Sequence, residues 1–315
     1  MFPKVSRLRS RISKLVTGDT PVPDLKPRLH AGDLAWLGDG DQSAHDANGK
    51  LRSCLCTQAL LESPEFVRWI MRLEPHALDE SGQVRLHRKL WEYGFIVQAL
   101  YERDLLRTGS MGLGFAVGRD PLPAYMASQG CPILATDLYA AQSVRLGWSP
   151  DNQHPSGLAA LNDRGLCSPK DFQRLVKFRP VDMNALPGDL QGFDFCWSAC
   201  AIEHLGSIRQ GLRFFERMLD TLRPGGVGVH TTEFNLLSND ATVDHQPTVL
   251  FRKRDFDELA QRLTRQSHHV DLVYQAGNTA ADLTVDLPPY RQDPHLKLGL
   301  MNFTTTSIGL IITKG

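Results

Sequence analysis

A glycine-rich stretch, Gly112–Gly118, constrains the fold of this chain more than any other feature. It reads Gly-Leu-Gly-Phe-Ala-Val-Gly and closes what reads as a buried strand. Nineteen positions after Gly118 comes Asp137, at the end of a second apolar run. Small residues let the backbone approach a ligand closely, and a carboxylate accepts hydrogen bonds from ribose hydroxyls. The pair therefore predicts a strand–turn–helix unit that holds a nucleoside cofactor.

Strand-like and helix-like segments alternate from about residue 107 onward. The apolar, strand-like runs lie at residues 111–116, 131–136, 176–181, 193–198 and 226–232, with later strands near 270–274 and 305–313. Helix-like segments lie between them, including residues 209–222 and 255–265. Alternation of this kind is typical of an α/β fold with a doubly wound, mostly parallel sheet.

The first 106 residues differ from the rest in pattern. Residues 18–50 are rich in Pro, Gly and Asp and predict a loop, whereas residues 57–106 carry apolar positions at helical spacing. We expect an N-terminal helical and loop extension over residues 1–106 and a main domain over residues 107–315. Within residues 1–16, basic and apolar positions alternate at helical spacing, which fits either a helix resting on an anionic membrane surface or a solvated terminal helix.

Charge and cysteine content exclude several classes of protein. The 35 basic and 35 acidic residues balance, so no basic face for nucleic acid is expected. The six cysteines contain no C-x-x-C pair, which favours buried thiols in a reducing compartment. No apolar run approaches the roughly 20 residues that span a bilayer, and no signal-peptide core follows the N-terminal bases. These features predict a cytoplasmic protein.

Polar residues gather where the predicted strands end. The third strand ends at Asp182-Met183-Asn184, and the fourth ends at Ser198 and runs into Glu203-His204. A Leu-Arg-Pro-Gly-Gly turn, residues 222–226, feeds the fifth strand, which ends at residues 230–233. Since ligands of open parallel sheets bind outside the carboxyl ends of the strands, we expect these residues to form one site.

This ordered set resembles the class I S-adenosylmethionine-dependent methyltransferases over residues 107–315. The resemblance implies a seven-stranded, Rossmann-like methyltransferase fold, S-adenosylmethionine as cofactor and methyltransferase activity. Residues 117–123 and 230–235 further resemble bacterial methyltransferases associated with glycan assembly.

The resemblance also implies which residues hold the cofactor. The backbone at the glycine turn would pass under its methionine portion, Asp137 would bind the ribose, and the residues ending the third strand would hold the adenine. The implied set is Gly114, Ala116, Gly118, Asp137, Asp182, Met183 and Ser198. Gly114 and Ala116 depart from the family pattern, because they stand where it has an acid and a central glycine.

His204 is the candidate general base for a hydroxyl acceptor, with Glu203 beside it to fix its tautomer. His230, at the fifth strand, is a candidate for the acceptor pocket together with Glu233. Each histidine also has a structural interpretation: His204 as an orienter of the following helix, His230 as a satisfied sheet histidine. A metal held by His204, His230, Glu233 and Asn235 is not supported by their spacing, so no metal is expected. Asp120, before Pro121, is interpreted as a helix cap.

The function that these residues predict is methyl transfer to a hydroxyl, or as second choice an amine, of a small molecule or sugar unit. The competing interpretation is a binding protein with a degenerate methyltransferase fold, which the departures at Gly114 and Ala116 favour. A nicotinamide-dependent oxidoreductase fits less well, because its tighter G-x-G-x-x-G turn is not matched here.

Overall fold

The structure is a computed structural model that describes residues 16–17, 25–38, 43–138, 158–291 and 293–315. The amphipathic segment predicted over residues 1–16, with its proposed membrane contact, lies outside these ranges apart from its last residue. Among the described residues, every helix is too short or too polar to traverse a lipid bilayer.

Five parallel strands form the centre of the molecule. They are β3 (Gly112–Gly114), β4 (Ile133–Asp137), β5 (Val176–Pro180), β6 (Phe193–Ala199) and β7 (Leu222–Asn235). Their order across the sheet is β5-β4-β3-β6-β7, so the chain winds outward first to one side of β3 and then to the other. This arrangement confirms the predicted doubly wound, Rossmann-like α/β fold. The sheet has eleven strands among the described residues rather than the seven predicted, because short strands extend it beyond β7. Its ligand crevice is expected at the carboxyl ends beside β3, where the winding reverses.

The other side of the sheet is antiparallel and mixed. β13 (Phe303–Thr313) runs antiparallel to β7 along most of its length. Beyond it lie short strands: β2 (Ser53–Leu55), β9 (His269–Val270), β10 (Leu272–Val273), β11 (Val285–Asp286) and β12 (Lys297–Leu300). β2 pairs with both β13 and β10, so a strand from the N-terminal part of the chain lies within the main sheet. The sequence predicted only helices and loops for residues 1–106.

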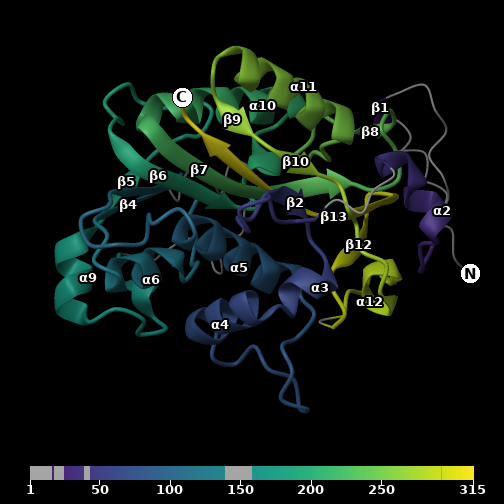
Figure 1. The fold of residues 1–315 in the computed structure, drawn as a ribbon, viewed down its shortest axis with the longest axis horizontal. Helices are drawn as coiled ribbons and strands as arrows, with labels where there is room; N and C mark the ends of the chain where they lie inside the picture. Colours follow the sequence, from purple (N-terminus) through teal and green to yellow (C-terminus); the bar gives the residue numbers. More distant parts are fainter. Residues whose placement is uncertain (1–15, 18–24, 39–42, 139–157, 292) are drawn as a thin grey trace, which may run out of the picture.

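Helices cover both faces of the sheet (Figure 1). One face carries α3 (Gln58–Leu61), α4 (Pro64–Leu73), α5 (Arg88–Tyr101), α6 (Leu122–Ser128) and α9 (Pro169–Leu175). The opposite face carries α10 (Ile208–Arg217) and α11 (Lys253–Arg265). The remaining short elements are β1 (Val16–Thr17), β8 (Thr242–Val243), α2 (Ala31–Leu34), α12 (Ala280–Leu283) and the 3₁₀ turns η1 (Ala35–Leu37), η2 (Leu158–Asn162), η3 (Ile202–His204) and η4 (Met218–Thr221).

Serine caps set where three of these helices begin. The hydroxyl oxygens of Ser63, Ser168 and Ser207 accept backbone N–H groups in the first turns of α4, α9 and α10. In α4 and α9 a proline follows the cap, where its missing N–H costs nothing. The sequence around each cap therefore determines where these helices begin.

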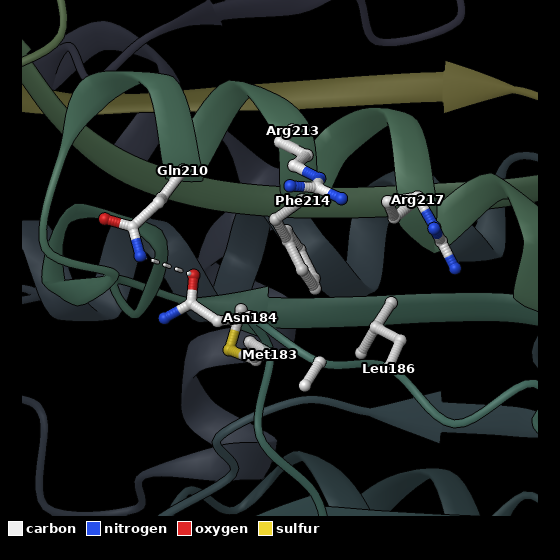
Figure 2. Close-up of a pocket in the computed structure, with 8 residues that line it drawn as sticks. Met183, Asn184, Leu186, Gln210, Arg213, Phe214 and Arg217 are labelled. Atoms are coloured by element: carbon white, nitrogen blue, oxygen red, sulfur yellow. Dashed lines mark hydrogen bonds between the residues drawn. The ribbon is translucent and has the colours of Figure 1, made fainter.

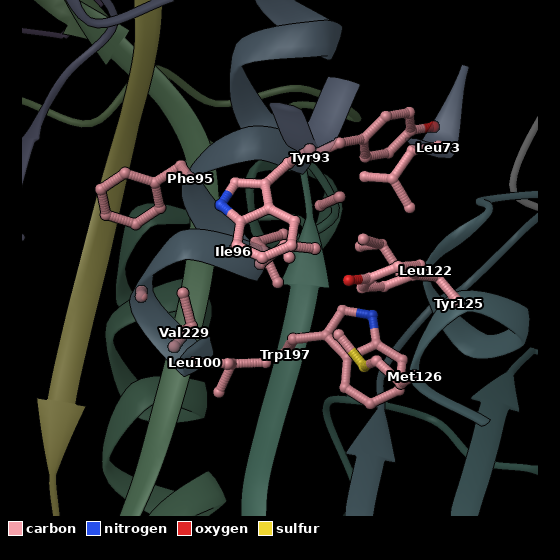
Figure 3. Close-up of a cluster of buried hydrophobic side chains, with 14 of the residues drawn as sticks. Leu73, Tyr93, Phe95, Ile96, Leu100, Leu122, Tyr125, Met126, Trp197 and Val229 are labelled. Atoms are coloured by element: carbon pink, nitrogen blue, oxygen red, sulfur yellow. The ribbon is translucent and has the colours of Figure 1, made fainter. Parts of the chain in front are cut away.

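The core under α5 is aromatic. Trp91 stacks on Phe95 with ring centroids 4.9 Å apart, and Trp197 of β6 lies beneath the helix beside Met126 (Figure 3). Almost every residue of α5 is buried, so this helix is enclosed between the sheet and α4. An enclosed helix shows no polar face in its sequence.

The turn predicted at residues 222–226 differs in the structure. β7 begins at Leu222, and the pairing with β6 shifts register between Phe193 and Phe195. Gly225 has φ of +74°, which only glycine adopts without strain. The segment is thus an irregular start of the strand rather than a separate loop.

Candidate active site

The glycine turn and the acid that ends β4 are bonded to each other. The backbone N–H of Gly118 donates to Oδ2 of Asp137 at 2.9 Å, and the N–H of Leu138 donates to Oδ1 at 2.7 Å. Ala116 and Gly118 both have left-handed φ angles, +47° and +49°. For alanine this conformation is strained, and it persists only because the structure around the turn enforces it.

Gly114 is a glycine because of Trp197. A Cβ built at Gly114 would lie 2.5 Å from Cζ2 of Trp197 and 2.6 Å from Cγ1 of Val117. Its carbonyl accepts the hydroxyl of Thr136 at 2.8 Å. The missing side chain at this position thus serves the packing of β3 against β6, and the sequence pattern alone did not show that.

Asp182 and Met183 lie beside Asp137, as the sequence predicts. The backbone N–H of Val181 donates to the carbonyl of Asp137 at 2.8 Å, which joins the ends of β4 and β5. Oδ1 of Asp182 accepts the N–H of Asn184 at 2.8 Å, and Met183 is buried. The ends of β3, β4 and β5 therefore bring Gly118, Asp137 and Asp182 to one edge of the sheet.

A cavity of about 180 Å³ opens next to Met183, between the loop after β5 and α10 (Figure 2). Met183, Leu186 and Phe214 supply apolar walls. Polar side chains complete the lining, and Nε2 of Gln210 donates to Oδ1 of Asn184 at 3.3 Å. Met183 thus forms part of the cavity wall, although the residue as a whole is buried.

Ser198 and His230 form a pair inside the core. Oγ of Ser198 lies 2.9 Å from Nδ1 of His230, and both residues are fully buried. The His230 ring packs edge-on against Phe214 and Phe215, with centroids 5.6 and 5.7 Å away. Burial lowers the pKa of His230 to about 3, which keeps the ring neutral. The structure does not bring His230 to Glu203 and His204, and its surroundings match the satisfied sheet histidine.

Glu203 and His204 follow β6 in the short turn η3. Glu203 is buried, and its Oε2 accepts the hydroxyl of Thr232 at 2.8 Å. Burial raises the pKa of Glu203, and the charge of nearby Glu233 adds to the effect, against the opposing influence of His204. Nε2 of His204 lies 3.9 Å from Oε1 of Glu203, beyond hydrogen-bond distance.

The His204 ring is oriented in part by contacts with Pro247 and Thr248. Its Nδ1 lies 2.9 Å from the carbonyl oxygen of Pro247 and 3.2 Å from Oγ1 of Thr248. Because a carbonyl only accepts, Nδ1 carries the proton and donates it to Pro247. In the neutral ring, Nε2 is then the basic nitrogen, on the side of Glu203.

Two cations at the start of α5 reach the ends of β6 and β7, and sequence reasoning missed them. Arg88 forms an ion pair with Glu233. Nζ of Lys89 lies 2.8 Å from Oε2 of Glu92 and 3.4 Å from the carbonyl oxygen of Ala199. The only sequence signal was the presence of charges beside Leu90 and Trp91 in an otherwise apolar helix.

Glu92 ties α5 to the sheet. Its Oε1 accepts Sγ–H of Cys200 at 2.9 Å and the hydroxyl of Ser307 at 2.6 Å. Burial raises the pKa of Glu92, but the cations Lys89 and Arg88 outweigh that effect and hold the pKa at about 2. Glu92 is thus a charged, fully buried carboxylate. Cys200 has φ of +50°, an unusual backbone conformation next to this cluster.

Asp120 joins the site from the loop after the glycine turn. The hydroxyl of Tyr93 donates to Oδ1 of Asp120 at 2.6 Å. Burial raises the pKa of Asp120 to about 6, although Lys89 acts in the opposite direction. The side chain therefore faces α5. The sequence predicted that Asp120 caps the following helix, but the N-cap of α6 is Pro121 and no side-chain hydrogen bond caps it.

Comparison with known proteins gave matches among solved structures only. No protein-family model matches the sequence, and no curated protein matches it. One similar structure is a putative sarcosine dimethylglycine methyltransferase from Galdieria sulphuraria, with 13% identity, a TM-score of 0.42 and coverage of 72% of this chain and 88% of that chain.

Two further solved structures are similar to a comparable degree. An S-adenosylmethionine-dependent methyltransferase from Mesorhizobium loti has 12% identity, a TM-score of 0.40 and coverage of 69% and 97%. A 1,6-didemethyltoxoflavin-N1-methyltransferase from Burkholderia thailandensis, solved with 1,6-didemethyltoxoflavin and S-adenosylhomocysteine, has 18% identity, a TM-score of 0.41 and coverage of 69% and 75%.

Proposed function

We propose that this chain is an S-adenosylmethionine-dependent methyltransferase that acts on a hydroxyl of a small molecule or sugar unit. One observation carries the proposal. The glycine turn after β3 is bonded through Gly118 to Asp137, and Asp137 is bonded through its backbone to Val181, just before Asp182. The turn, the acid proposed for the ribose and the acid proposed for the adenine thus lie at the same carboxyl edge, beside the point where the winding of the sheet reverses.

The chemistry of these residues fits the cofactor. A carboxylate oxygen can accept more than one hydrogen bond, so the backbone donors on Asp137 are compatible with ribose hydroxyls as further donors. Met183 lines the cavity and offers an apolar flank for a ring. Asp182, whose Oδ1 accepts the N–H of Asn184, can also accept from an amino group in this proposal. When bound, the cofactor supplies an activated methyl group on a sulfonium. Gly114, Ala116, Gly118 and Ser198 contribute backbone along the methionine side in this proposal.

The protein's part in the reaction is to align the acceptor and take its proton. Alignment can offset roughly 7–11 kcal/mol of the barrier. In this proposal Nε2 of His204 accepts the hydroxyl proton, with Nδ1 anchored on Pro247. General-base assistance contributes on the order of 100- to 10,000-fold. Glu203 stabilises the resulting imidazolium by its charge rather than by a hydrogen bond, since the two groups are 3.9 Å apart.

We also propose that the N-terminal part, residues 1–106, shapes the acceptor side. The support is α5, which brings Arg88, Lys89 and Glu92 to the ends of β6 and β7. A sugar unit as acceptor rests on the sequence resemblance of residues 117–123 and 230–235.

A second candidate function is cofactor binding without catalysis. Ala116 favours it, because its left-handed backbone and added methyl group occupy the turn where the family has glycine. Two measurements separate the candidates. Calorimetric titration with S-adenosylmethionine tests binding, and transfer of a labelled methyl group from it into a cell extract tests catalysis. Binding with labelling supports the methyltransferase, binding without labelling supports the second candidate, and absence of binding contradicts both.

A further inference from the structure

Three side chains with metal-ligating atoms converge where β6 and β7 end. Cys200, Glu203 and Glu233 each place a sulfur or carboxylate oxygen within 4.8 Å of the other two. Cys200 and Glu203 follow β6, and Glu233 lies near the end of the neighbouring strand β7. Glu203 and Glu233 are buried, and Cys200 is partly exposed. Cys200 therefore lies on the side from which an ion would enter.

An unsatisfied carboxylate oxygen indicates that this cluster lacks a partner. Glu233 is 2% exposed. Its Oε1 pairs with Arg88, whereas its Oε2 is buried and accepts no hydrogen bond from the part of the chain that the structure describes. A buried polar atom of this kind calls for an explanation, and a bound ion or an ordered water is a common one.

We propose that Cys200, Glu203 and Glu233 bind one thiophilic divalent cation of the zinc class. A thiolate with two carboxylates suits Zn²⁺ or Co²⁺, whereas Mg²⁺ and Ca²⁺ prefer sets made of oxygen alone. Bond lengths of about 2.3 Å to sulfur and about 2.0 Å to oxygen require the three side chains to close in from their present spacing. Three protein ligands would leave a fourth position open.

The charges around the cluster balance with such an ion in place. Arg88 and Lys89 are matched by Glu233 and Glu92, with which they form ion pairs. The two charges of the cation are then matched by the Cys200 thiolate and the Glu203 carboxylate. Cys200 releases its thiol proton to solvent on binding, so its hydrogen bond to Glu92 is replaced by the bond from sulfur to metal.

The sequence did not reveal this set because its spacing is not that of a known metal motif. Cys200 and Glu203 are three residues apart, but Glu233 is contributed by the neighbouring strand, thirty positions further along. The position of the cluster depends on the parallel pairing of Ser198 with His230. The inference does not rest on the proposed methyl transfer, and its test needs no acceptor.

Cobalt titration of the full chain, stripped with a chelator and dialysed, tests the proposal. We expect one Co²⁺ per chain and a near-ultraviolet thiolate-to-cobalt charge-transfer band, with Zn²⁺ displacing the cobalt. Cys200→Ser should abolish the band, and Glu233→Gln should weaken Zn²⁺ binding at least tenfold by calorimetry. Cys167→Ser is the matched control, because Cys167 is a buried thiol on another part of the fold; it should keep the band.

Thermal unfolding without metal shows whether each variant folds. Glu203→Gln serves as a second ligand variant if Cys200→Ser does not fold, and it too should weaken Zn²⁺ binding. The proposal is overturned if the wild-type chain gives no thiolate band, if Cys200→Ser keeps it, or if Cys167→Ser loses it.

Discussion

The N–H of Gly118 donates to Oδ2 of Asp137 at 2.9 Å, so the glycine turn after β3 and the acid that ends β4 form one unit. The two residues are nineteen positions apart in sequence, and the parallel pairing of Gly114 with Ala135 brings them together. The bond has two consequences. Asp137 shapes the turn, and in the proposed function it also offers oxygens to the cofactor, so loss of its carboxylate should affect both.

Asp137→Ala should weaken the binding of S-adenosylmethionine by about 1–3 kcal/mol, the range for a lost hydrogen bond to a charged group. Calorimetric titration of the purified variant measures this change. Asp137→Asn should have a smaller effect of the same sign, because an amide retains one acceptor oxygen. Asp189→Ala, a carboxylate on the surface in an ion pair with Arg179, is the control and should bind as the wild type does. Wild-type affinity in Asp137→Ala would refute the ribose role.

His204→Ala should slow methyl transfer by on the order of 100- to 10,000-fold, because a general base contributes that much. Cofactor affinity should remain nearly unchanged, since Nε2 lies beside Glu203 and Nδ1 beside Pro247 and Thr248, which are not among the residues proposed to hold the cofactor. The rate is followed as labelled methyl transferred from S-adenosylmethionine to a cell extract. The exposed residue His76 provides the control variant His76→Ala. Equal labelling by His204→Ala and wild type would remove His204 from the reaction.

Most strands of the central sheet could be predicted because they are largely apolar runs and several are separated by helices. β5 is less apolar, since it carries Lys177 and Arg179. β2 could not, because Ser53–Leu55 is only three residues long and lies in a part of the chain without that alternation. Its strand conformation depends on pairing with β13 and β10, which are more than 200 positions away. Tertiary pairing thus created a strand that local sequence does not specify.

The position of Asp137 and Asp182 at one edge of the sheet was predictable, and the position of the charged residues of α5 was not. Asp137 and Asp182 follow directly from where strands end. Arg88 and Lys89 reach the site only because α5 crosses the ends of β6 and β7, a relation with no local trace. His230 also lies on a strand near the site, but its side chain is bonded to Ser198 and packs in the core beside Phe214.

Asp120 should make the protein less stable as the pH rises from about 4 to about 6. Burial raises its pKa to about 6 in the folded chain, whereas an unfolded chain has a pKa of about 3.9. The unfolded chain therefore loses the proton first, and the free energy of unfolding falls through this window. Two pKa units correspond to roughly 3 kcal/mol.

Asp120→Asn removes this titration and keeps an acceptor for Tyr93. Urea unfolding at several pH values should show the variant gaining stability relative to the wild type as the pH rises, with the difference levelling off above about pH 6. Asp220→Asn, at an exposed carboxylate paired with Arg217, controls for loss of a surface charge. Parallel stability curves for Asp120→Asn and wild type would show that Asp120 ionises as it does in the unfolded chain.

Gly114→Ala should destabilise the fold by about 1–3 kcal/mol, the usual cost of overpacking. The added Cβ would lie 2.5 Å from Cζ2 of Trp197 and 2.6 Å from Cγ1 of Val117, closer than side-chain contacts allow. Gly188→Ala, at a glycine whose added Cβ meets nothing within 4 Å, is the matched control and should change stability little. Chemical denaturation of both variants measures the difference.

Replacement of the tryptophan separates packing from cofactor binding as the reason for Gly114. Trp197→Phe removes the ring atoms nearest the added methyl group, so Gly114→Ala should cost less in that background, with a coupling free energy of about 0.5–3 kcal/mol. A glycine kept for close approach of the cofactor would instead show the same cost in both backgrounds, together with weakened binding of S-adenosylmethionine in Gly114→Ala. The clash with Trp197 is present without any ligand. We therefore expect Gly114→Ala to lower the stability of the free protein, and to do so less in the Trp197→Phe background.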